Sequence, residues 1–120
     1  MNFGLTTDQV SDGVAVLALS GEVDLYSAPD VKEELLRLID GGANCVIVDL
    51  GQATFLDSTA LAVLLGAVKR LRSRGGDLVI VCADRNIRKI FEITGLDRVF
   101  PLHDDRDSAL EALAGEATTG

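Results

Sequence analysis

Apolar runs alternate with stretches of helical periodicity along most of the chain. A weak strand, Phe3–Val10, is followed by the dipeptide Asp12–Gly13, which is suited to the positive φ angles of a tight hairpin turn. Three later runs are apolar without alternation, as in strands buried on both faces of a sheet: Val14–Leu19, Cys45–Leu50 and Leu78–Ala83. The pattern therefore predicts an opening antiparallel hairpin whose second strand is central.

Helical spacing fills the intervals between the strands. One amphipathic helix is expected from its N-cap at Ser27 to Ile39, and a longer one from Ser58 to Arg74, each ended by a Gly-Gly pair. Two shorter helices are expected at Arg85–Thr94 and from Asp104 to about Ala114, with a short edge strand at Val99–Leu102 between them. Strand, helix and strand at this spacing favour a right-handed unit with parallel strands.

These elements predict the α/β fold class with a single domain. The expected sheet is mixed: it has an N-terminal antiparallel hairpin, is otherwise mainly parallel, and is packed with about four α-helices. The domain is expected to cover residues 1–114, with residues 115–120 forming a frayed C-terminal tail.

Charge and composition narrow the classes of partner. The chain has 120 residues and a formal net charge of −8, which repels nucleic acid and anionic membrane surfaces. The first ten residues lack a signal-peptide pattern, and no apolar run is long enough to span a membrane. We therefore expect a cytoplasmic protein in which Cys45 and Cys82, both inside strand-like runs, are buried thiols without a disulfide.

The segment Thr54–Leu61, called the corner below, joins the strand at Cys45–Leu50 to the longest predicted helix. It places Asp57, Ser58 and Thr59 at the helix start. A serine in this position usually only caps the helix. Here Asp57 can already serve as the cap, so the two hydroxyls that follow it are surplus, which favours a functional role for Ser58.

Phosphorylation of Ser58 is a change that this corner suits. A phosphate adds about −1.5 to −2 charges and three acceptor oxygens. The helix N-terminus stabilises added negative charge by about 0.3–1 kcal/mol, while Asp57, with Asp24 nearby, offsets that gain by repulsion. We expect the fold to change little, and a partner fitted to the neutral corner to be repelled.

Other chemistries lack the residues that they need. A phospho-aspartate receiver requires a lysine after the last strand, and none follows Lys89, although Glu22, Asp24 and Asp49 could mimic its acids. Hydrolysis by Ser58 requires a base, and the only histidine, His103, lies beside two aspartates in a loop. The glycine pairs follow helices rather than strands, and no residues have metal-ligand spacing. We expect no cofactor, no metal and no enzymatic activity.

Three segments carry a resemblance to a known family. Gly21-Glu22-Val23-Asp24, Phe55-Leu56-Asp57-Ser58-Thr59-Ala60-Leu61 and Ile93-Thr94-Gly95-Leu96 resemble, in order and spacing, the bacterial anti-sigma factor antagonists. These are the stand-alone members of the STAS domain family (sulfate transporter and anti-sigma factor antagonist). The resemblance covers the chain from about Phe3 to Leu113. Many relatives have glycine where Ala60 stands, and Thr59 replaces a frequent second serine.

The resemblance implies a regulatory binding module. An unphosphorylated antagonist of this family binds an anti-sigma factor that is also an ATP-dependent serine kinase, and so frees a sigma factor. Phosphorylation by that kinase ends the interaction, and a serine phosphatase restores it. Carried over, the acceptor is Ser58, with Thr59 as the alternative. The expected contact residues are Asp24, Leu25, Tyr26, Asp57, Ser58, Thr59, Leu61 and Ala62.

Two other readings stay open. One is a STAS scaffold or transporter-associated subunit that docks constitutively without phosphorylation. The other is a small hydrolase that would need both Ser58 and His103. We expect the chain to be a monomer or a weak dimer.

Overall fold

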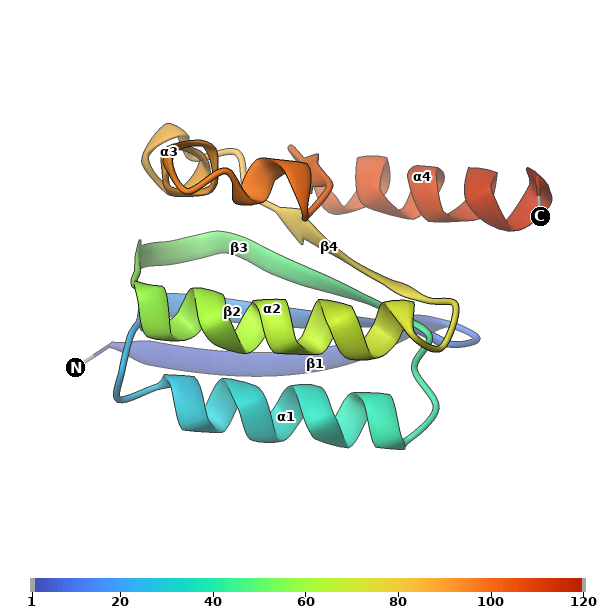
Figure 1. The fold of residues 1–120 in the computed structure, drawn as a ribbon, viewed down its shortest axis with the longest axis horizontal. Helices are drawn as coiled ribbons and strands as arrows, with labels where there is room; N and C mark the ends of the chain where they lie inside the picture. The colour runs from blue at the N-terminus through green and yellow to red at the C-terminus, as the bar shows by residue number, and fades with distance from the viewer. Residues whose placement is uncertain (1, 120) are drawn as a thin grey trace.

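Five strands form one sheet in the order β1-β2-β3-β4-β5, and four α-helices pack on it (Figure 1). The computed structural model describes the backbone of residues 2–119 and the side chains of residues 2–113. Its elements are β1 (Phe3–Ser11), β2 (Val14–Val23), α1 (Ala28–Asp40), β3 (Cys45–Leu56), α2 (Ser58–Arg72), β4 (Asp77–Val81), α3 (Arg85–Ile93), the 3-10 helix η1 (Leu96–Arg98), β5 (Leu102–His103) and α4 (Arg106–Thr119).

The strand directions confirm the predicted mixed sheet. β1 and β2 pair antiparallel, and the β2–β3, β3–β4 and β4–β5 pairs are all parallel. The hairpin turns at Gly13, whose φ of 74° lies in the left-handed region that glycine adopts without strain. None of the described helices is both long and apolar enough to cross a membrane.

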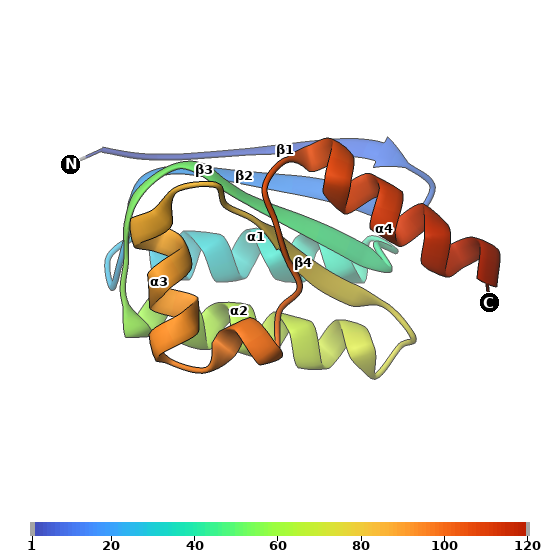
Figure 2. The same ribbon diagram turned by 90° about the horizontal axis from the view of Figure 1, so that it is seen from above.

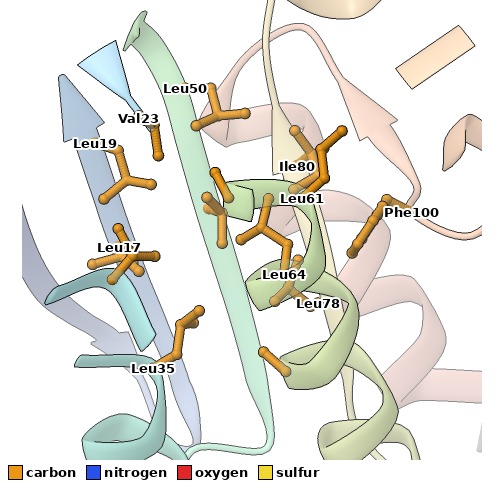
Figure 3. Close-up of a cluster of buried hydrophobic side chains, with 14 of the residues drawn as sticks. Leu17, Leu19, Val23, Leu35, Leu50, Leu61, Leu64, Leu78, Ile80 and Phe100 are labelled. Carbon is orange, nitrogen blue, oxygen red and sulfur yellow. The ribbon is translucent and has the colours of Figure 1, made fainter. Parts of the chain in front are cut away.

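The helices divide between the two faces of the sheet. α1 and α2 lie side by side on one face, where α3 also packs, and α4 covers the other (Figures 1 and 2). The larger core lies under α1, α2 and α3, and Figure 3 shows Leu17 and Leu19 of β2 on the same side of the sheet as Leu61 and Leu64 of α2. Phe91 and Phe100 belong to the same core, and their rings pack edge to face with centroids 5.8 Å apart.

β2 and β3 extend beyond the predicted ends at Leu19 and Leu50. Their last residues still pair, Glu22 with Phe55 and Val23 with Leu56, past the end of β4. The pairing shifts register in this stretch, and Ala53 and Leu56 are buried while Thr54 and Phe55 between them are exposed. Ser20–Val23, beyond the predicted end of the strand, therefore belong to β2, and the chain turns only at Asp24–Ser27.

The segment before α4 also differs from the prediction. The edge strand is Leu102–His103 rather than Val99–Leu102, because the N–H groups of Val99 and Phe100 both donate to the Leu96 carbonyl and close a helical turn. α4 begins at Arg106, after a cap by Asp105. Side chains beyond Leu113 lie outside the described part, so the domain end at 114 and the frayed tail at 115–120 remain predictions.

The two cysteines form no disulfide. Cys82 is fully buried, as predicted. Cys45 is partly exposed, because it lies at the start of β3 under the edge of α4. The expectation that both thiols are buried was therefore wrong for Cys45.

Candidate functional site

The corner lies where β2 and β3 end together at one edge of the sheet. The N–H of Asp57 donates to the carbonyl of Val23 at 3.2 Å, which continues the pairing of the two strands by one residue. Asp57 is extended, with φ −110° and ψ 179°, and its Oδ1 accepts from the N–H of Ala60 at 3.0 Å. Asp57 is therefore the cap of α2, as the sequence predicted, and the hydroxyl of Ser58 is not needed for that role.

The turn Asp24–Ser27 is fixed by side chains within it. Oδ1 of Asp24 accepts from the N–H groups of Tyr26 at 2.9 Å and Ser27 at 3.2 Å. The Ser27 hydroxyl donates to the Glu22 carbonyl at 3.0 Å and accepts from the Asp24 N–H at 2.8 Å. Ser27 occupies the N-cap position of α1, but its side chain makes no cap bond, because it closes this turn instead.

A hydrogen bond attaches the turn to the corner. The N–H of Leu25 donates to Oδ2 of Asp57 at 3.0 Å. Each oxygen of this carboxylate thus accepts a backbone N–H, one from the turn and one from the first turn of α2. The predicted neighbours Asp24, Leu25 and Tyr26 are held beside Asp57 and Ser58 in this way.

The predicted contact residues differ in exposure. Ser58 and Ala62 are exposed on α2, whereas Thr59 is half-buried and turned toward α1. Leu25 and Tyr26 are 58% and 76% exposed. Leu61 is only 6% exposed and belongs to the larger core.

Phe55 is a surface residue of this site that is not in the contact set predicted from the sequence. It is 47% exposed, next to the buried Leu56, at the end of β3. With Leu25 and Tyr26 it forms what we call the corner patch, three large apolar side chains exposed at one edge of the sheet. Regular alternation would place Phe55 on the same face as the buried Ala53, so its exposure follows from the register shift between these two residues, for which the sequence carries no local signal.

The groups that other chemistries would need lie elsewhere. Nδ1 of His103 contacts Oγ of Ser108 at 3.1 Å, so the only histidine is engaged with α4 and not with Ser58. Oδ2 of Asp49 is held by Nε of Arg106 at 2.7 Å, which ties β3 to α4. Among the described residues, no group of three or more His, Cys, Asp or Glu side chains could hold a metal ion.

Comparison with known proteins identifies the class. The model of the STAS domain family matches residues 6–109. The anti-sigma-B factor antagonist of Bacillus subtilis is 32% identical over 102 residues, which are 85% of this chain and 92% of the relative. The chain belongs to the STAS domain family, of which the anti-sigma factor antagonists that it matches are members.

Solved structures share the fold. An anti-sigma factor antagonist from Mycobacterium paratuberculosis superposes with a TM-score of 0.84 at 28% identity, over 92% of this chain and 93% of that one. SpoIIAA has been solved unphosphorylated, with a TM-score of 0.81 at 21% identity over 93% of this chain and 97% of its own. Bacillus SpoIIAA has also been solved phosphorylated, with a TM-score of 0.73 at 19% identity over 92% and 99%.

Proposed function

We propose that this chain is an anti-sigma factor antagonist that switches partners through Ser58. With Ser58 unmodified, the corner binds an anti-sigma factor that is also a serine kinase, and a sigma factor is released. That kinase phosphorylates Ser58 and ends the interaction, and a serine phosphatase reverses it. The observation that carries the proposal is an exposed serine directly after a carboxylate whose two oxygens already hold the helix start and the neighbouring turn.

The surroundings of Ser58 suit a switch that acts on binding and spares the fold. A phosphate there lies at the positive end of α2, where its charge is tolerated, and beside Asp57, which repels it. The corner patch flanks the same spot. A partner that covers these apolar side chains would have to remove water from the phosphate, which is strongly unfavourable without a cation to pair it.

Exposure favours Ser58 over Thr59 as the acceptor. Ser58 is exposed, while Thr59 is half-buried against the space between α1 and α2. A kinase must bring the acceptor hydroxyl into line with the γ-phosphate of ATP, which requires an accessible side chain. ATP belongs to the kinase, and this chain needs no cofactor and no catalysis of its own.

The relatives support this assignment. The Bacillus subtilis relative and the Mycobacterium paratuberculosis structure are named anti-sigma factor antagonists, and SpoIIAA of this fold has a phosphorylated form. The proposed setting is the cytoplasm, with the chain as a monomer or a weak dimer. The acidic net charge of −8 supports a protein partner rather than nucleic acid.

The test uses the kinase-type anti-sigma factor encoded in the same genome. Incubation with it and ATP should add one phosphate to the peptide that contains Ser58, seen by intact mass and peptide mapping, and none to Ser58→Ala. Ser58→Ala should bind the kinase constitutively, and Ser58→Asp should bind at least about tenfold more weakly.

A matched control is Ser11→Asp, which places the same charge on an exposed serine at the end of β1 that lies away from the corner and should leave binding unchanged. Ser58→Asp binding as tightly as the unmodified chain would refute the switch. Tight binding with no phosphate added would instead indicate a STAS scaffold that docks constitutively.

A further inference from the structure

A groove runs along the surface between α1 and α2, and its lining begins at Thr59, the residue after Ser58. Its volume is about 350 Å³, and its lining residues come from α1 and α2, the two helices that lie side by side in Figure 1. Leu36 of α1 and Ala62, Val63 and Gly66 of α2 line it, and Thr59 lies at its corner end. The groove is therefore continuous with the surface that carries the proposed switch.

Gly66 is an unexpected residue for the middle of α2. Glycine is the least favourable residue in a helix interior apart from proline. A Cβ added at Gly66 would meet no atom within 4 Å, so the packing of this domain does not require glycine there. Its effect is to leave the helix backbone bare in the groove, one turn after Ala62. Small residues at this spacing allow another helix to approach closely.

The charges at the groove favour an acidic occupant. Lys32 of α1 and Arg70 of α2 line it, and no Asp or Glu does. Arg70 has only a loose exposed contact to Asp40 at 4.0 Å, and Lys32 has no ion-pair partner among the residues that the structure describes. The chain as a whole has a net charge of −8, whereas the charged side chains that line this groove are both positive.

From these observations we propose that the groove binds an amphipathic helix of the anti-sigma partner, whose apolar ridge packs on Ala62 and Gly66 and whose carboxylates meet Lys32 and Arg70. The assignment rests on the proposed function and deepens it. It also supplies a second reason why phosphorylation of Ser58 would end binding. A phosphate on Ser58, next to the end of the groove, repels the carboxylates of the docked helix.

The test measures binding of the purified kinase-type anti-sigma factor to the full chain by isothermal titration calorimetry. Gly66→Leu fills the groove, and Arg70→Glu reverses one of its charges; each should weaken binding at least about tenfold. Lys69→Glu is the matched control, since Lys69 is the exposed neighbour of Arg70, lies outside the groove and undergoes the same change of charge. It should alter the affinity less than about threefold.

Folding of each variant is checked by thermal unfolding. Gly66→Ala should also bind more weakly than the unmodified chain. Because alanine favours the helix more than glycine does, that loss of affinity cannot arise from unfolding. In the complex, the methyl signals of Leu36, Ala62 and Val63 should shift, and those of Ala109 on α4 should not.

The outcomes separate this proposal from the one on which it rests. If the unmodified chain binds and Gly66→Leu and Arg70→Glu bind equally well, the groove assignment is wrong and the partner switch is unaffected. No binding by the unmodified chain or by Ser58→Ala overturns both. A self-associated chain that Gly66→Leu converts to a monomer overturns the assignment in favour of a second copy of the chain in the groove.

Discussion

The backbone N–H of Leu25 donates to the carboxylate of Asp57 across a sequence separation of 32 residues. The other oxygen of that carboxylate caps α2 through Ala60. One side chain therefore sets both the start of α2 and the position of the turn that presents Leu25 and Tyr26. This bond gives Asp57 a structural role beside any effect of its charge on Ser58.

Replacing Asp57 should separate its two roles. Asp57→Ala removes both acceptors and should lower the free energy of unfolding by about 0.5–2 kcal/mol, as for other lost N-caps. Asp57→Asn keeps one acceptor oxygen, and asparagine caps helices about as well as aspartate. It should cost less than about 1 kcal/mol, because the bond that it weakens is exposed.

Urea unfolding measures the stabilities, and amide hydrogen exchange at Leu25 reports on the turn. Exchange should accelerate in both variants. Unchanged exchange at Leu25 in Asp57→Ala would show that the turn is held by its internal bonds through Asp24 and Ser27 alone.

The sequence located the corner but not the shape of its surroundings. Helical spacing and the cap residue Asp57 were sufficient to predict where α2 begins, because both are local features. The extension of β2 and β3 to Val23 and Leu56 depends on pairing between the two strands, including register shifts, which no single segment encodes. The bond between Leu25 and Asp57 follows from that extension, so it could not be predicted either.

Gly21 should be sensitive to substitution for a reason that lies in the N-terminal strand. Its φ is +77°, and an added Cβ would lie 1.7 Å from the carbonyl oxygen of Asn2. That same oxygen accepts from the N–H of Glu22 at 2.7 Å. Gly21→Ala must therefore both strain the backbone and detach the start of β1.

Gly75 provides the matched control. It has a φ of +81°, but a Cβ there would meet no atom within 4 Å. Gly75→Ala should cost only the left-handed strain of about 1–2 kcal/mol, and Gly21→Ala should cost more than that in urea unfolding. If both variants lose the same free energy of unfolding, residues 2 and 3 can move away from the new Cβ without destabilising the fold.

Cys82 should make stability depend on alkaline pH. Burial raises the pKa of its thiol, with the nearby Arg88 guanidinium opposing the shift in part. Because the folded pKa lies above the unfolded one, the contribution to stability is complete below the unfolded pKa and is lost as the pH rises through the folded pKa. Urea unfolding between neutral pH and about pH 10 should show this decline.

The decline should be smaller in Cys82→Ala and retained in Cys45→Ala. Thiol alkylation gives an independent check, since Cys82 is fully buried and should react only as fast as the domain opens. Rapid alkylation of Cys82 in the folded chain would contradict its burial.

Tyr26 and Leu61 should separate binding from folding. Both belong to the contact set predicted from the sequence, yet Tyr26 is 76% exposed and Leu61 is 6% exposed. Tyr26→Ala should change the free energy of unfolding by less than about 0.5 kcal/mol. It should weaken binding to the anti-sigma kinase at least about tenfold if the aromatic ring is buried on docking. Leu61→Ala should instead cost about 2–5 kcal/mol of stability, because it leaves a cavity under the corner.

Calorimetric binding beside urea unfolding measures both quantities for each variant, and Val10→Ala serves as the control for an exposed apolar residue outside the corner patch. Val10→Ala should change neither quantity appreciably. Since Leu61 is buried in the core, any loss of binding in Leu61→Ala should follow the loss of folded protein and recover at temperatures where the variant is fully folded. A Leu61→Ala domain that is fully folded yet unable to bind would return Leu61 to the interface, and Tyr26→Ala binding with full affinity would remove the aromatic ring from it.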